Sequence, residues 1–286
     1  MTDPVRQIAD AVLYEGYLLW PYRRSATKNR RRWTFGGVYP PGHSALHPDD
    51  PSQLQADVEV EGNPQVDVRV RFLQVVERSL RDVDGNPVDE LPGWLAWDEA
   101  TEREVGPGTF TIAAGAQREP VDGGTIVRSW RELRGRVDVT HTGNRVRVVI
   151  ANETPWAGGT RDDALRQTLC STHAVLHTRV GAFVSATESK CESVGLWPVL
   201  VGEPGARDTM LAAPIILGDY PQIAPESPGD LFDATEIDKL LVLNVLALTP
   251  EEQAEMRATD PRAREILDRC AALSPEELMR LHGTFR

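Results

Sequence analysis

Hydrophobic and polar residues alternate in two parts of the chain, and each part has the pattern of a β-hairpin. In the first, residues 57–60 and 66–72 flank the turn sequence Gly-Asn-Pro. In the second, residues 137–140 and 146–150 flank Gly143-Asn144, which tolerates the positive φ of a tight turn. A period of two places every other side chain on one face of a strand. We therefore predict two antiparallel hairpins whose buried rows include Val68, Val70, Val146 and Val148.

Shorter apolar or alternating stretches predict more strands along the same part of the chain. They lie at 109–113, 173–184, 199–201 and 215–217, and turns rich in glycine and proline separate them. Many short strands between such turns are typical of an antiparallel sandwich or barrel rather than a parallel α/β sheet. We expect a β-rich body over residues 1–228.

The pattern changes after residue 228. Thr249, Asp260 and Ser274 are each followed by proline, which places a good N-cap residue directly before proline at the first helical position. This arrangement predicts three short helices. The expected fold class is α+β, with a helical C-terminal region over residues 229–286.

Composition and charge narrow the possible functions. The 286 residues are 41% hydrophobic and 26% charged, as in folded globular proteins. The net charge of −12 argues against general nucleic-acid binding, which requires a basic face, so we expect a protein or small-molecule partner. We expect a soluble cytoplasmic protein without a membrane span. The chain has three scattered cysteines, an N-terminus without the apolar stretch of a signal peptide, and no long apolar run.

Residues 14–37, the aromatic–basic segment, combine six aromatic residues with six cations. Arginine beside tryptophan and tyrosine is typical of interface hot spots. Alternatively, the rings belong to the core and the arginines form a solvated strip. The acidic, proline-rich segment 219–238 is either a surface connector or an ordered binding loop. We hypothesise that the basic residues contact an acidic partner or this loop; the candidate binding residues are Tyr17, Trp20, Tyr22, Arg23, Arg24, Lys28, Asn29, Arg32, Trp33, Glu226, Asp230, Asp233, Glu236 and Asp238.

One cluster has side chains that bind soft metals: Cys170, His173, His177 and Cys191. In a strand the two histidines would lie about 13 Å apart, too far for one metal ion. In a helix, the same spacing would bring them together. Ordinary sheet residues are the favoured interpretation, so no metal or catalytic residue is assigned and the cofactor is unknown.

Both ends of the chain resemble one family. The run Glu15-Gly-Tyr-Leu-Leu-Trp-Pro-Tyr-Arg-Arg-Ser-Ala, with Arg32-Trp33 after it, is similar to the opening of a family of uncharacterised bacterial proteins. These proteins are encoded beside nickel–iron hydrogenases, especially the high-affinity hydrogenases of actinobacteria. The strings at 224–230, 233–238, 260–264 and 281–283 resemble the same family.

The resemblance implies a role in hydrogenase assembly or operation and transfers no catalytic residue. We therefore expect a non-catalytic accessory protein that docks a hydrogenase subunit or maturation factor. The rival expectation is a metal-handling factor or enzyme that uses the cluster at 170–191.

Overall fold

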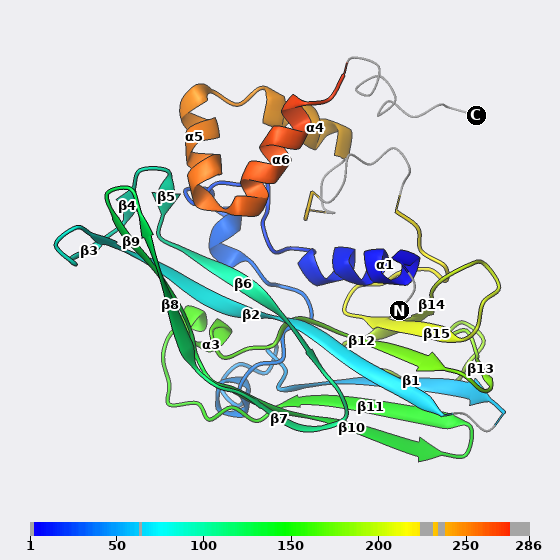
Figure 1. The fold of residues 1–286 in the computed structure, drawn as a ribbon. Helices are drawn as coiled ribbons and strands as arrows, with labels where there is room; N and C mark the ends of the chain where they lie inside the picture. The colour runs from blue at the N-terminus through cyan, green and yellow to red at the C-terminus, as the bar shows by residue number, and fades with distance from the viewer. Residues whose placement is uncertain (1–2, 63–64, 224–230, 234–237, 275–286) are drawn as a thin grey trace.

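Two antiparallel sheets and a group of C-terminal helices make up the fold in the computed structural model, which describes residues 3–62, 65–223, 231–233 and 238–274 (Figure 1). The fold is therefore α+β with a β-rich body, as the sequence predicts. A five-stranded sheet has the order β13-β1-β11-β10-β7. An eight-stranded sheet has the order β14-β15-β12-β2-β9-β8, and β3 and β6 also pair with β2.

The strands of the first sheet are β1 (Gln53–Glu61), β7 (Gly108–Ile112), β10 (Leu133–Thr142), β11 (Arg145–Asn152) and β13 (Ala182–Phe183). Those of the second are β2 (Val66–Asp82), β3 (Pro87–Val88), β6 (Trp97–Val105), β8 (Gly115–Val121), β9 (Gly124–Trp130), β12 (Cys170–Thr178), β14 (Trp197–Leu200) and β15 (Thr209–Ala213). A small separate ladder joins β4 (Glu90–Leu91) to β5 (Trp94–Leu95). The helices are α1 (Asp3–Tyr14), α2 (Pro41–Ser44), α3 (Arg161–Leu165), α4 (Asp238–Leu246), α5 (Pro250–Thr259) and α6 (Pro261–Ala271), with a 3-10 turn at Lys28–Arg31.

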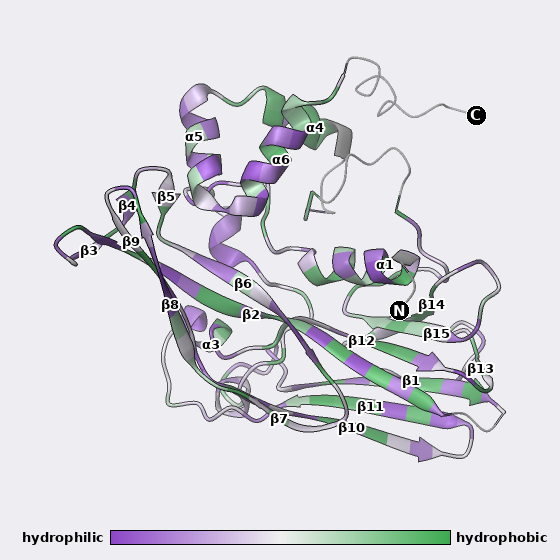
Figure 2. Ribbon diagram, viewed as in Figure 1, coloured by the Kyte–Doolittle hydropathy of each residue, from purple (hydrophilic) through white to green (hydrophobic). Residues whose placement is uncertain are grey.

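The second predicted hairpin is confirmed. Strands β10 and β11 pair with Val137 opposite Ile150 and Val139 opposite Val148. Val146 and Val148 are buried, and so are Val68 and Val70 on β2, as the alternation requires. Figure 2 shows the alternation as green and purple bands along β1 and β11.

The first predicted hairpin is wrong. Strand β1 pairs with β11 and β13, whereas β2 pairs with β12, β6 and β9. The two strands therefore lie in different sheets, and their valine rows meet in one core cluster. Alternation determines which face of a strand is buried, but it does not determine which strand lies beside it. The predicted strand at 215–217 is also wrong, because β15 ends at Ala213.

Helix α1 and the C-terminal helices cover the second sheet (Figure 1). Val5, Ala9 and Val12 of α1 pack against residues of β12, β14 and β15. The far end of α1 enters another hydrophobic cluster, which also contains buried residues of α4, α5 and α6. The predicted boundary at 228/229 lies outside the described residues, and this cluster joins the two sides of it.

Two of the three predicted helix starts are confirmed. The Thr249 hydroxyl accepts a hydrogen bond from the Glu252 amide, and the Glu252 carboxylate accepts one from the Thr249 amide, so the pair forms a capping box. Asp260 caps α6 by accepting a hydrogen bond from the Arg262 amide. The helix predicted after Ser274 lies outside the described residues.

Replacing Thr249 with alanine should lower the free energy of unfolding by about 1 kcal/mol, because an amide at the start of α5 loses its acceptor. Chemical denaturation of the two proteins measures this difference. The exposed Thr142, at the end of β10, provides a control, and Thr142→Ala should stay within about 0.5 kcal/mol. Equal effects of the two substitutions would contradict a specific role for the cap.

None of the described helices is both long and apolar enough to cross a membrane.

Candidate functional site

The aromatic rings of the aromatic–basic segment lie mostly inside the protein. Tyr17, Tyr22 and Trp33 are buried, and Trp20 is half-buried. The Tyr17 hydroxyl donates to the Asp260 carboxylate at 2.7 Å, and the Tyr22 hydroxyl donates to the Leu231 carbonyl at 2.6 Å. These rings therefore join the start of the chain to residues more than 200 positions later.

Several cations of this segment also contact the C-terminal part of the chain. Arg23 forms ion pairs with Glu252 at 3.0 Å and Glu255 at 3.8 Å, both on α5. Lys28 lies 3.7 Å from the buried Asp233 carboxylate. That carboxylate also accepts a hydrogen bond from the Trp20 amide at 3.0 Å. The hypothesised contact between the basic residues and the chain's own acidic loop is thus present at Asp233.

Arg32 is the most enclosed cation of the segment, with only 5% of its surface exposed. Its guanidinium carbon lies 4.2 Å from the ring centre of Trp33 and 3.6 Å from that of Trp97. The guanidinium donates to the carbonyl oxygens of Tyr17 at 3.2 Å and Asp98 at 2.6 Å. Burial lowers the pKa of Arg32, and the nearby Tyr17, Asp260 and Asp98 oppose that effect. Arg32 therefore acts as a charged core residue between two indole rings.

The remaining candidates of the segment hold its backbone in place. The Asn29 amide nitrogen donates to the carbonyls of Leu19 and Arg23, and its oxygen accepts from the Leu19 amide. Arg24 donates to the carbonyls of Asp89 and Ala96.

Of the acidic candidates, Glu226, Asp230 and Glu236 lie outside the described residues. Asp238 is the first residue given for α4, and its side chain is not described.

Three of the four cysteine and histidine candidates lie on β12, and Cys191 lies elsewhere. Cys170 and His173 are fully buried on β12, where burial raises the pKa of Cys170 to about 12. Burial and the charge of Arg71 lower the pKa of His173 to about 3. His177 lies on the same strand and contacts the Thr209 hydroxyl at 3.1 Å. Among the residues that the structure describes, no three histidine, cysteine, aspartate or glutamate side chains are grouped so that they could hold a metal ion.

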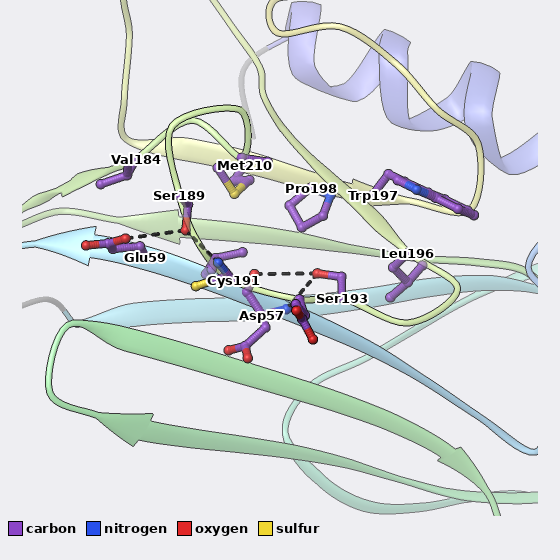
Figure 3. A pocket seen from close by; sticks show the side chains of 13 residues that line it. Asp57, Glu59, Val184, Ser189, Cys191, Ser193, Leu196, Trp197, Pro198 and Met210 are labelled. Atoms are coloured by element: carbon purple, nitrogen blue, oxygen red, sulfur yellow. Dashed lines mark hydrogen bonds between the residues drawn. The ribbon is translucent and has the colours of Figure 1, made fainter.

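Cys191 lies elsewhere, in an open groove beside strand β1. The groove has a volume of about 440 Å³ and is lined by β1, the loop 184–196 and strands β14 and β15. Figure 3 shows the lining side chains. The apolar ones include Val58, Leu196 and Met210, and Trp197 lies at one end with 43% of its surface exposed. We refer to this feature as the β1 groove.

Hydrogen bonds hold the loop 184–196 against β1. The Asp57 amide donates to the Ser193 hydroxyl at 2.9 Å, so a side chain takes the place of a neighbouring strand. The Ser189 hydroxyl donates to the Glu59 carboxylate at 3.3 Å. Asp57 is buried, and its carboxylate pairs with Arg147 at 2.8 Å. These polar groups therefore fix the shape of the β1 groove.

The lining of the β1 groove is acidic. It contains Asp57, Glu59 and Glu192 and no lysine or arginine. Glu192 is exposed and forms no ion pair with any residue of the described ranges. The groove can therefore attract a positively charged group, and its apolar residues can bury an adjoining hydrophobic side chain.

Sequence reasoning did not identify Trp97, Trp197 or the carboxylates of the β1 groove. Trp97 begins β6, whose sequence is mostly charged and polar and does not alternate clearly. Trp197 begins the short strand β14, and the residue after it is Pro198. The signal in the sequence for the groove was the tryptophan in Leu196-Trp197-Pro198, but its exposure is visible only in the structure.

No protein-family model matches the chain, and no curated protein matches it.

Proposed function

We propose that this protein is a non-catalytic accessory protein that binds another protein in the β1 groove. The observation that carries the proposal is a preformed acidic groove between β1 and the loop 184–196, with a half-exposed tryptophan at its end. Tryptophan is enriched among residues that contribute most to protein–protein affinity. The groove's polar groups are bonded to one another, which supports a role in presenting a surface rather than in chemistry.

The lining indicates which partner segment fits. Exposed Glu192 favours a lysine or arginine on the partner. Leu196, Met210 and Trp197 favour an apolar side chain next to that cation. Successive side chains of an extended peptide point to opposite sides, so one can meet Glu192 while its neighbour meets the apolar lining. The proposed ligand is therefore an extended segment with one basic and one apolar residue.

The finer proposal is that the partner is a nickel–iron hydrogenase subunit or one of its maturation factors. It rests on the sequence resemblance at the two ends of the chain. The buried aromatic–basic segment carries much of that resemblance, and its contacts support a role in holding the fold together while the β1 groove meets the partner.

We expect Trp197→Ala and Glu192→Lys each to reduce capture of the partner by at least about fivefold, because each removes a principal contact of the groove. The measurement is quantitative affinity capture from the native cell with the full chain as bait. Both residues are exposed, so the melting temperature should change little.

Matched controls separate the groove from general surface effects. Asp122→Lys makes the same charge change at an exposed acid in the turn between β8 and β9, and Val83→Ala removes an exposed apolar side chain elsewhere. Both controls should capture the partner normally. Equal capture by all four variants and the wild-type protein would contradict docking in the β1 groove.

A further inference from the structure

We propose that a second cavity, lined by arginines, binds a small organic anion that carries carboxylate or phosphate groups. This arginine cavity has a volume of about 490 Å³. It lies between the aromatic–basic segment, strands β2 and β6, and helix α3. No residue lines both the arginine cavity and the β1 groove, so this proposal is independent of the one for the groove.

Positive charge exceeds negative charge in the lining. Five arginines face three carboxylates in a chain whose net charge is −12. The arginines are Arg24, Arg30, Arg32, Arg78 and Arg166, and the acids are Glu77, Asp98 and Asp162. Such a concentration of cations attracts anions.

Two of the three acids are already engaged by one arginine. Arg166 lies 3.3 Å from the Asp98 carboxylate and 3.6 Å from that of Glu77. Arg24 and Arg32 donate to backbone carbonyls and form no ion pair within the described residues. Arg30 is exposed and also forms none there. Arg78 pairs with Glu99 at 2.6 Å, which leaves Arg24, Arg30 and Arg32 as the arginines of the lining without an ion pair in the described structure.

Unpaired hydrogen-bond donors are a second, independent observation. The indole nitrogens of Trp33 and Trp97 and the Nε atom of Arg166 are buried, and each lacks an acceptor in the described structure. All three belong to residues that line the cavity, and Trp33 and Trp97 are 97% and 91% buried. Buried donors normally have a partner, and these three nitrogens are enclosed by protein atoms at the wall of the cavity.

Size and chemistry together define the ligand class. The cavity lies within the range of roughly 300–1,000 Å³ that is usual for small-molecule sites. Arginine's planar fork matches the oxygens of carboxylates and phosphates. A small organic anion of either kind would bring acceptor oxygens and negative charge to Arg24, Arg30 and Arg32.

Calorimetric titration of the full-length protein at low ionic strength tests the proposal, with pyrophosphate and citrate as probes. We expect at least one probe to bind, and the stronger one assigns phosphate or carboxylate. Arg30→Glu should weaken binding at least about tenfold, because it reverses a charge in the lining. Arg31→Glu is the matched control: it makes the same charge change at the next residue, which is exposed and outside the lining, and should weaken binding less than about threefold. Equal weakening by the two variants, or no binding of either probe at millimolar concentration, overturns the proposal.

The NMR signals of the indole N–H groups report binding in the wild-type protein, without any substitution in the cavity. On addition of the bound probe, the Trp33 and Trp97 signals should move, whereas the signal of Trp197 in the β1 groove should stay in place. Tryptophan-to-phenylalanine variants assign the signals. Binding that leaves both the Trp33 and the Trp97 signals unmoved overturns the assignment to this cavity.

Discussion

Replacing Arg32 with alanine should lower the free energy of unfolding by about 3 kcal/mol, since charged hydrogen bonds and cation–π contacts are lost together. The substitution removes a charged donor from the carbonyls of Tyr17 and Asp98 and opens a space between two indole rings. Alanine, on the other hand, avoids the cost of burying a charge. Burial lowers the pKa of Arg32 because of that same cost. We expect the lost contacts to exceed that gain, because the guanidinium has both hydrogen bonds and aromatic faces around it.

Two further variants make this prediction specific. Arg31→Ala, next in the chain and exposed, should change stability by less than about 0.5 kcal/mol. Arg32→Lys keeps the charge but cannot match the planar stacking on Trp33 and Trp97, so it should recover only part of the loss. Denaturant unfolding measures all three. If Arg32→Ala unfolds like Arg31→Ala, the stack contributes nothing and our account of the segment fails.

Acid should destabilise the protein through His173. Burial, assisted by the charge of Arg71, lowers the pKa of this histidine from its ordinary value of 6.5 to about 3. The unfolded chain therefore binds a proton below pH 6.5 that the folded chain does not accept until about pH 3. This contribution to stability is complete above pH 6.5 and is lost as the pH falls. Between pH 7 and pH 5 the loss from this one group should be about 2 kcal/mol.

The comparison with a variant isolates His173 from other titrating groups. Burial raises the pKa of Asp98 and Asp260, so these two work in the opposite direction as the pH falls. The quantity to measure is therefore the difference in pH dependence between the wild-type protein and His173→Gln, by denaturation at pH 7 and pH 5. The variant should lack the loss of about 2 kcal/mol, and His141→Gln, at an exposed position, should retain it. Identical pH dependence of wild type and His173→Gln would show that the buried imidazole is not the cause.

Local patterns predicted local structure in this chain. Gly143-Asn144 identified the β10–β11 hairpin, and proline after Thr249 and Asp260 identified the starts of α5 and α6. In each case, the interacting groups lie within a few residues of one another. The β1–β2 hairpin was predicted wrongly because the valine pattern is the same whether two strands pair within a sheet or face each other across a core.

The candidate site depended on contacts that no local pattern contains. Arg32 stacks on Trp97, which is 65 residues away, and Arg23 pairs with Glu252. The composition of the aromatic–basic segment marked it as unusual, but composition alone does not distinguish an exposed binding strip from a buried charged core. The β1 groove combines β1 with residues more than 120 positions later, so its lining became visible only in the structure.

The closure of the chain on itself has a consequence for its synthesis. The Tyr17 hydroxyl meets Asp260, and the two residues are 243 positions apart. A ribosome makes Tyr17 long before Asp260, so the cluster that contains α1, α4, α5 and α6 cannot form until α6 has been translated. The two β-sheets have all their strands by residue 213, before α4 has been made. Until α4, α5 and α6 have been made, the rings of Tyr17, Tyr22 and Trp33 lack these partners, and the emerging chain carries an aromatic surface that the three helices later cover.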